Sequence, residues 1–366
     1  MRTIKNIQRA LRLIDSAISD FELDMRGISV LTEAASGPFA VTPIIAAMAG
    51  ADRVFCIGRN SNWGAYRDVV EHIQCLAKSA GCLSQIEFSD GCAVNYAKYA
   101  NVVTNLGFVR PLNADFIKRL PSDSAIALMW EPWEYRPGEV DIDACRACNV
   151  PILGTNEGHH RLQTFRYLGH VALRLLFERE VEVERSELLL IASNPFAAPI
   201  EKTLRAAGAN VTRIDPSEEL RWAEMAEVLL GQIKIDAIVL AEHRSEDVII
   251  GKGGISSDIL TANGTELIHI CGLVDGDELL RMRINKHPLR PVPAKVMTVT
   301  TDYIGPRPVI DLHAAGLSIA TDLVKQMRQG RDEAVARRNV VSAGLGMDFE
   351  AKESTSLSIQ NRTLEL

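Results

Sequence analysis

The chain has 366 residues, of which 47% are hydrophobic and 24% are charged, and its formal net charge is −7. This composition is typical of a globular protein, and the length favours two domains. The negative charge, without a lysine- or arginine-rich run, excludes the usual nucleic-acid-binding surface. No apolar stretch is long enough to span a bilayer, and the N-terminus is an amphipathic segment with acids, so we expect a cytoplasmic protein with no membrane or nucleic-acid partner.

The seven cysteines are spread through the chain, which is typical of a protein from a reducing compartment. Only Cys145 and Cys148 form a CxxC pair, and no second pair completes a zinc site. We therefore expect no metal site.

The first part of the chain begins with helical spacing of apolar residues over 3–24. Short apolar runs and helical segments then alternate. The predicted strands lie at 28–31, 53–57, near 86, and at 102–105, 125–129 and 151–154, and the predicted helices at 39–48, 66–80, 94–99 and 141–148. This alternation predicts a parallel sheet with helices on both faces.

The second part repeats the pattern. A long helix over 159–180 is predicted to lead into strands at 188–191, 211–214, 237–240, 267–271 and 296–300, with helices at 195–207 and 222–230 and a closing helix at 308–327. The fold class is thus α/β, with two Rossmann-like, doubly wound parallel-sheet domains and a cleft between them. The predicted boundaries are 1–158 (substrate domain), 159–184 (interdomain helix), 185–307 (nucleotide-binding domain), 308–330 (closing helix) and 331–366 (polar tail).

The segment 187–216 reads as one βαβ unit and is the centre of the second domain. In a dinucleotide-binding fold a glycine-rich turn faces the pyrophosphate, and an acid about 20 residues later binds the ribose hydroxyls. Asp215 stands at the place of that acid and favours NAD over NADP, but the turn reads ASNPFA over 192–197 and lacks the glycines. Whether a nucleotide still binds is therefore open. The candidate cofactor-binding residues are Ser193, Asn194, Pro195, Phe196, Asp215, Glu242, Cys271 and Asp302.

Polar side chains follow five predicted strands of the first domain. Parallel strands bring their carboxyl ends to one edge, where such folds bind ligands. The candidate substrate-binding residues are Thr32, Glu33, Ser36, Arg59, Ser61, Asn105, Arg110, Glu134, Asn156, Glu157 and, after the second domain, Arg307. The candidate catalytic residues are His159, His160, Tyr303 and Glu131.

Each of these groups also has a structural interpretation. Ser36 either caps a helix or forms part of an anion site, since both use the free backbone amides at the start of a helix. Arg59 and Arg110 either pair with neighbouring carboxylates or bind an anionic substrate. Glu131 and Glu134 belong to a solvated loop, or burial beside tryptophan raises the pKa of one of them for acid–base work. The histidine pair begins the long helix and either moves protons or packs. Tyr303 either gives a proton, with Arg307 lowering its pKa, or is a packing residue.

From residue 150 onwards the order of parts resembles the D-isomer-specific 2-hydroxyacid dehydrogenase superfamily, which includes formate and glycerate dehydrogenases. The segments VPILGTNEGHH, LLLIASNPFAA, IHICGLVDGDEL, NKHPLRPVPAKV and TTDYIGPRP follow one another as in that family. The resemblance implies a NAD-linked oxidoreductase and a homodimer. The positions that match the family's substrate-binding arginine, its acidic partner and its catalytic histidine are Cys271, Lys286 or His287, and Tyr303, so the family's catalytic residues do not carry over.

Two hypotheses of function follow. The first is a NAD(P)-linked oxidoreductase of a biosynthetic pathway that acts on a small anionic substrate, with Arg59 or Arg110 holding its acid group and His159, His160 or Tyr303 moving the proton. The second is a non-redox lyase, ligase or transferase on the same frame. A catalytically silent binding protein is a third possibility, which the many ionisable groups at one edge disfavour.

Overall fold

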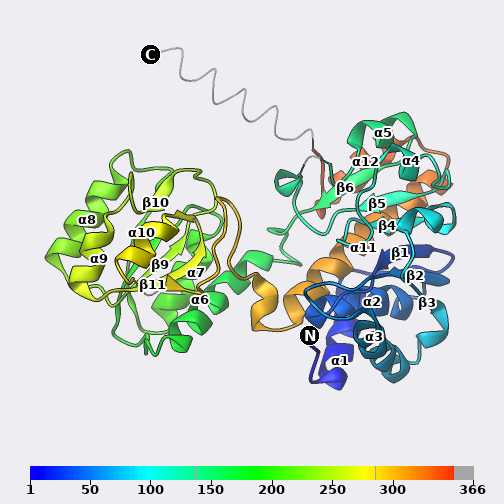
Figure 1. Cartoon of the computed structure of the whole chain (residues 1–366). Coiled ribbons are helices and arrows are strands. Elements are labelled where there is room, and N and C mark those ends of the chain that lie inside the picture. The colour runs from blue at the N-terminus through cyan, green and yellow to red at the C-terminus, as the bar shows by residue number, and fades with distance from the viewer. Residues whose placement is uncertain (137, 285, 350–366) are drawn as a thin grey trace, which may run out of the picture. The chain divides into compact units, whose positions relative to one another are not determined.

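The computed structural model describes residues 1–136, 138–284 and 286–349. The chain forms two compact units (Figure 1). Unit 1 contains residues 1–163 and the chain from Pro306 onwards, and unit 2 contains residues 164–305. Each unit is built on a parallel sheet, so the predicted α/β fold with two Rossmann-like domains is confirmed.

The sheet of unit 1 reverses its strand order in the middle. Its strands are β1 Ser29–Glu33, β2 Arg53–Ile57, β3 Ile86–Ser89, β4 Val102–Thr104, β5 Ala125–Ala127, β6 Ile152–Thr155 and β14 Gly346–Met347. They lie in the order β14-β6-β5-β4-β1-β2-β3, and all pairs are parallel except β14 with β6. The chain builds outward from β1 to β3 and then crosses to β4, so β1 and β4 flank the switch point where such sheets bind ligands.

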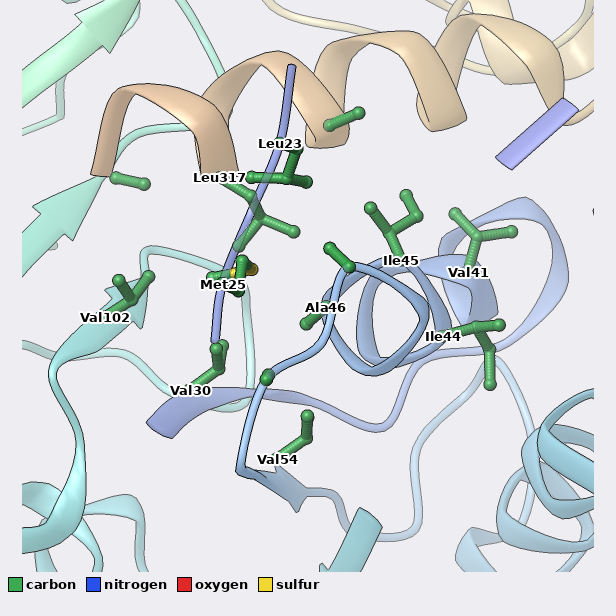
Figure 2. Packing of buried hydrophobic residues seen from close by; sticks show 14 of the residues in the cluster. Leu23, Met25, Val30, Val41, Ile44, Ile45, Ala46, Val54, Val102 and Leu317 are labelled. Atoms are coloured by element: carbon green, nitrogen blue, oxygen red, sulfur yellow. The ribbon is translucent and has the colours of Figure 1, made fainter. Parts of the chain in front are cut away.

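Successive residues of these strands face opposite layers, because side chains alternate across a sheet. Val30, Val54 and Val102 pack under α2 Thr42–Met48 and α11 Arg307–Arg328, as Figure 2 shows. α1 Ile7–Asp20 and α3 Tyr66–Ala80 complete this layer. Leu31 and Phe55 face the other layer, which includes α4 Ala114–Ile117 and α5 Ile142–Ala147.

Residues 331–349 belong to unit 1 and do not form the predicted polar tail. They form α12 Glu333–Ser342 and β14, while residues 350–366 lie outside the described part of the chain. Arg337 pairs with Glu333 at 2.7 Å and also with Asp348, which fixes the helix and the edge strand together. Composition did not reveal this helix because its buried face is short.

Unit 2 contains a five-stranded sheet and a two-stranded ribbon. The sheet has the order β13-β11-β9-β7-β8, formed by β7 Glu187–Ile191, β8 Asn210–Ile214, β9 Ala237–Ala241, β11 Glu266–Cys271 and β13 Lys286–His287. The ribbon pairs β10 Val248–Ile250 with β12 Leu273–Val274. One face of the sheet packs on α6 Tyr167–Glu178 and α7 Ala197–Ala206, and the other on α8 Trp222–Gln232, α9 Ser257–Asn263 and α10 Gly276–Arg281. Here the strand order reverses between β7 and β9.

Three predicted elements are wrong. The helix predicted over 94–99 is two short 3₁₀ helices, η3 Ala93–Asn95 and η4 Ala97–Tyr99. The helix predicted over 159–180 begins only at Tyr167, because Gln163 has φ +49° and a right-handed helix cannot pass through it. The strand predicted over 296–300 is a loop in which Met297 makes a single bridge to Cys271. The backbone amide of Thr298 donates to the carbonyl of Ile270 at 2.8 Å, and its side chain donates to the carbonyl of His269 at 2.5 Å, but the pairing does not extend into a strand.

Candidate functional site

Glu33 ends β1 at the switch point of unit 1. Its carboxyl is buried, and Oε2 accepts a hydrogen bond from the amide of Phe108 at 3.1 Å. Burial raises the pKa of Glu33, although the backbone amides of Phe108 and Gly107 and the positive charge of Arg110 oppose the shift. The carboxyl therefore keeps its proton to a higher pH than an exposed glutamate does.

Two arginines lie near this carboxyl, and they are bound differently. Arg110 pairs with Glu139 and stacks over Trp130, with its guanidinium carbon 5.5 Å from the ring centre. Arg59 is exposed and stacks over Phe108 at 5.4 Å. The structural interpretation of a carboxylate partner thus holds for Arg110, and Arg59 remains the arginine that is open to an anion.

Asn105 follows β4 and is fully buried. Its Oδ1 accepts a hydrogen bond from the amide of Met129 at 3.0 Å. Among the described residues its Nδ2 has no hydrogen-bond partner. An unsatisfied buried donor is rare in folded proteins and marks a place for a ligand or an ordered water.

Three predicted acids, Glu131, Glu134 and Glu157, come together beyond β5 and β6. Glu131 accepts from the indole of Trp133 at 2.6 Å and from the amide of Glu157 at 3.1 Å. Burial raises the pKa of Glu134 to about 7, and the neighbouring charge of Glu131 adds to the shift, whereas hydrogen bonds from the Glu131 backbone and the Glu157 side chain oppose it. The carboxyl with the raised pKa is thus that of Glu134, and it lies in a cluster that is largely satisfied internally.

Three other predicted residues of this edge, Thr32, Ser61 and Asn156, have structural contacts. Thr32 accepts from the hydroxyl of Thr104 at 3.0 Å in the sheet interior. Ser36 precedes the short 3₁₀ helix η1 Gly37–Val41 and makes no side-chain cap bond. Ser61 closes an exposed turn by accepting from Trp63. Asn156 donates to the carbonyl of Gly344 at 3.0 Å and so holds the segment before β14.

The two histidines lie in a turn after β6, not in a helix. Their ring centres are 4.3 Å apart, and Nδ1 of His159 accepts from the amide of Arg161 at 3.3 Å. Partial burial lowers the pKa of His159, and the charges of His160 and Arg161 lower it further. His159 is therefore neutral near pH 7, and its role in proton transfer stays a prediction.

In unit 2 a serine and two acids meet at the switch point. The hydroxyl of Ser193 after β7 lies 2.7 Å from Oδ1 of Asp215 and 2.5 Å from Oε2 of Glu242. Asp215 also binds Ser217 and Arg213. Partial burial raises the pKa of Asp215, but these hydrogen bonds outweigh it and the net shift is downward, so the carboxylate is ionised. The structure thus joins three residues that the sequence placed in one candidate set.

The loop 192–197, which lacks the glycines of the dinucleotide-binding turn, caps the helix that follows it. Oδ1 of Asn194 accepts from the amide of Ala198 at 3.2 Å, and the amides of Phe196 and Ala197 both bond to the carbonyl of Ser193. Pro195 carries no amide proton, and its peptide bond to Asn194 is cis. Phe196 stacks on His243 with ring centres 4.1 Å apart. These amides, which a glycine-rich turn offers to pyrophosphate, are used within the loop.

Two further candidates differ in their surroundings. Cys271 ends β11, and its carbonyl accepts from the amide of Glu242 at 3.2 Å, so it lies beside the serine–acid cluster. Burial raises the pKa of the Cys271 thiol to about 12, so it is neither a thiolate nor a substitute for a guanidinium. Asp302 lies in the 3₁₀ turn η7 Thr301–Ile304 and accepts a hydrogen bond from the hydroxyl of the preceding Thr300.

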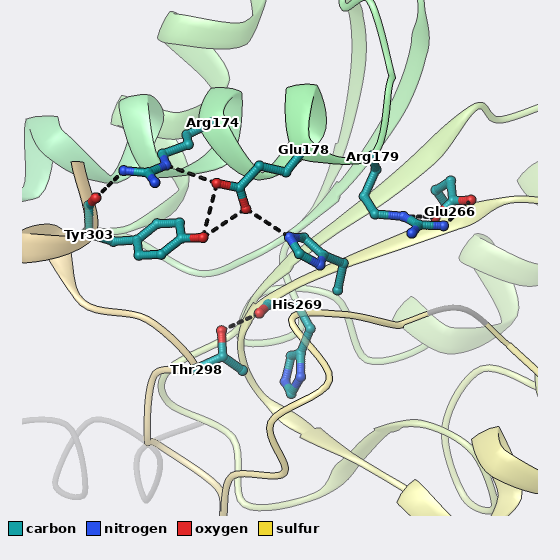
Figure 3. A network of polar contacts seen from close by, with 8 residues as sticks. Arg174, Glu178, Arg179, Glu266, His269, Thr298 and Tyr303 are labelled. Atoms are coloured by element: carbon teal, nitrogen blue, oxygen red, sulfur yellow. Dashed lines mark hydrogen bonds and ion pairs between the residues drawn. The ribbon is translucent and has the colours of Figure 1, made fainter. Parts of the chain in front are cut away.

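Tyr303 belongs to a separate polar network, which Figure 3 shows. Its hydroxyl donates to Glu178 at 2.8 Å, and His287 and Arg174 bind the same carboxylate. Next to Glu178 in the chain, Arg179 pairs with Glu266, the first residue of β11. The network therefore lies toward the amino end of β11, away from the strand ends that carry Ser193 and Glu242.

The expected effect of Arg307 on Tyr303 is wrong. Arg307 begins α11 in unit 1 and pairs with Asp311 at 3.2 Å. Partial burial and the hydrogen bond to Glu178 raise the pKa of Tyr303. This arrangement favours a structural role for the phenol, and its assignment as a proton donor stays a prediction.

No known protein family matches the sequence, and no curated protein matches it. Solved structures do match. The A chain of dipicolinate synthase from Bacillus subtilis is 12% identical with a TM-score of 0.53, over 85% of this chain and 100% of that chain. The chain therefore shares the two-domain α/β fold of that protein. At this identity the likeness establishes the fold and not the activity.

Two other matches with this fold are weaker. The pyruvate reductase of Chlamydomonas reinhardtii is 11% identical with a TM-score of 0.48, over 84% of this chain and 98% of that chain. D-lactate dehydrogenase from Escherichia coli is 10% identical with a TM-score of 0.44, over 83% of this chain and 98% of that chain.

Sequence reasoning missed several residues of these two sites. Ser217 and Arg213 bind Asp215, and both lie two residues from it, a spacing typical of local hydrogen bonding around aspartate. Phe108, which holds Glu33, gave no signal because its backbone amide makes the contact. In the described residues no group of three or more His, Cys, Asp or Glu side chains could hold a metal ion. None of the helices described there combines the length and apolarity that crossing a bilayer requires.

Proposed function

We propose that this protein is a NAD-linked oxidoreductase that acts on a small anionic substrate. The nucleotide binds at the carboxyl ends of β7, β8 and β9 in unit 2. The substrate binds at the switch point of unit 1, where Arg59 holds its anionic group. The predicted homodimer stays a prediction.

The observation that carries the proposal is that two serine hydroxyls donate to one carboxylate oxygen of Asp215. In the dinucleotide-binding fold, the acid at the end of the second strand binds the two ribose hydroxyls. Here Oδ1 of Asp215 accepts from the hydroxyls of Ser193 and Ser217, each at 2.7 Å. We infer that a ribose hydroxyl replaces the exposed Ser217 hydroxyl. The ionised carboxylate would repel the additional phosphate of NADP, so NAD is preferred.

Calorimetric titration with NAD, NADP and adenosine tests this proposal. We expect NAD to bind more tightly than NADP. Asp215→Asn should lower the affinity for NAD roughly 10- to 100-fold, because a hydrogen bond to a charged group is lost. Ser217→Ala should leave NAD binding unchanged or strengthen it, because it frees the carboxylate. If NAD leaves the wild-type melting temperature and the calorimetric heat unchanged at saturating concentration, the NAD-linked function is rejected.

A specific observation favours a second candidate, a non-redox enzyme on the dehydrogenase frame. The first-turn amides of α7 are bonded within the loop, and the prolines at 195 and 199 supply no donor. A pyrophosphate would have to compete with Asn194 for the amide of Ala198. Under this alternative neither NAD nor adenosine binds unit 2, while small carboxylates still bind unit 1 in an Arg59-dependent way.

A further inference from the structure

Glu33 and Asn105 lie on the two neighbouring strands where the sheet order of unit 1 reverses. Glu33 is the last residue of β1, and Asn105 directly follows β4, its parallel neighbour. Both side chains are buried, at 8% and 0% exposure. Parallel strands present both residues at the same carboxyl edge.

The amide of Asn105 is held in place with one donor group unused. The bond from the Met129 amide to Oδ1 at 3.0 Å fixes which way the side chain points. Nδ2 has no partner among the described residues. A buried donor without a partner costs about 1–3 kcal/mol, which an oxygen of a bound molecule would recover.

The carboxyl of Glu33 and the guanidinium of Arg110 converge at Gly107. A Cβ atom at Gly107 would lie 3.3 Å from Oε2 of Glu33 and 3.9 Å from Nη2 of Arg110. The neighbouring amide of Phe108 donates to the same Oε2, and the Phe108 ring carries the guanidinium of Arg59. The carboxyl of Glu33 and the exposed guanidinium of Arg59 thus both contact the short loop that contains Phe108.

From this geometry we infer that Glu33 exchanges a proton with the substrate, whose reacting oxygen is bound between Glu33 and Asn105 while its anionic group faces Arg59. The inference rests on the proposed substrate site in unit 1 and does not depend on nucleotide binding in unit 2. In the forward step the O–H bond of the Glu33 carboxyl breaks as an O–H bond forms on the substrate oxygen. The carboxylate that remains accepts from the amide of Phe108 and is stabilised by the charge of Arg110.

The charged and titratable groups around Glu33 fit this role. Arg110 faces it from the loop after β4 and stabilises the ionised form, while burial disfavours that form and raises the pKa of Glu33. On β2, the thiol of Cys56 donates to the backbone carbonyl of Glu33 at 3.3 Å. Burial also raises the pKa of Cys56, so the thiol stays neutral. Glu33 is thus the group that titrates here.

The test compares two probes, pyruvate and propionate, which share a carboxylate and differ in the carbonyl oxygen. Calorimetry gives their affinities from pH 5 to 9 for the wild type and Glu33→Gln, which keeps an oxygen acceptor for Phe108. We expect pyruvate affinity to fall about tenfold per pH unit above the pKa of Glu33 in the wild type and to stay flat in Glu33→Gln. Propionate affinity should be flat in both proteins.

Asn105→Asp supplies a second arm, because it keeps the acceptor for Met129 and removes the free donor. It should lower the ratio of pyruvate to propionate affinity by about tenfold. Equal pH slopes in the wild type and Glu33→Gln, or an unchanged ratio in Asn105→Asp, would overturn the inference. If neither pyruvate nor propionate binds, both this inference and the proposed substrate site in unit 1 are rejected. NAD binding would then still test the proposed nucleotide site in unit 2 separately. Should Glu33→Gln not fold, the infrared band of the protonated Glu33 carboxyl must shift when pyruvate binds the wild type.

Discussion

The hydroxyl of Tyr303 binds the carboxylate of Glu178, which lies 125 residues earlier in the chain. The carboxylate also accepts from His287 and Arg174, and the Arg174 guanidinium stacks on the tyrosine ring at 4.0 Å. One acid therefore joins α6, β13 and η7 within unit 2. This contact gives Tyr303 a structural role in unit 2.

Tyr303→Phe should destabilise unit 2 by about 1 kcal/mol, because it removes a hydrogen bond to a charged, partly exposed acceptor. Burial raises the pKa of Glu178, but the bonds from His287, Tyr303 and Arg174 outweigh it, and the folded-state pKa is lower than 4.5. The stabilisation is therefore complete above about pH 4.5 and declines as pH falls through the folded pKa. Urea unfolding at pH 7 and pH 3 measures this, with Glu178→Gln as the comparison. An equal effect of Tyr303→Phe at both pH values would contradict it.

Ser193→Ala should destabilise unit 2 by about 2–3 kcal/mol, because the two acids lose the buried hydroxyl that lies between them. Ser217→Ala is the matched control, since it removes a hydroxyl from the same Asp215 oxygen at an exposed position, and it should cost less than about 1 kcal/mol. Thermal unfolding of both variants compares them. Equal losses would show that the hydroxyl of Ser193 has no special role.

Glu134→Gln should make the protein more stable above pH 7. The carboxyl has a folded pKa of about 7 against an ordinary 4.5, so the folded state holds the proton that the unfolded chain releases. The wild type therefore loses stability as pH rises from about 4.5 to 7, by on the order of 2 kcal/mol. Unfolding free energies at pH 5 and pH 8 check the sign, and a Glu134→Gln variant that is less stable than the wild type at pH 8 would refute it.

Gly169→Ala should destabilise unit 2 by about 1–3 kcal/mol through overpacking. A Cβ at Gly169 in α6 would lie 2.1 Å from Oγ1 of Thr203 and 2.8 Å from the carbonyl of Pro199, both in α7. Gly231→Ala in α8 is the control, because nothing lies within 4 Å of its Cβ position, and it should stabilise by up to about 1 kcal/mol. Opposite signs in chemical denaturation are expected, and a neutral Gly169→Ala would show that α6 and α7 can separate.

The elements themselves were largely predictable from local pattern. The helix over 66–80 and the strand over 53–57 have the predicted bounds, because each carries a complete periodic signal. The helix α12 was missed because few of its residues are buried, as was the turn at Gln163, where one positive φ ends a helical pattern.

The sequence by itself determined the two parallel sheets, because strand and helix periodicity is local and burial follows from it. It also placed Asp215, Glu33 and Asn105 at strand ends. Only the tertiary structure decided which of these groups touch: Ser193 joins Asp215 and Glu242, Phe108 holds Glu33, and Tyr303 joins Glu178. The physical reason is that the protonation and availability of a polar group depend on partners far away in the chain, and no local pattern encodes those partners.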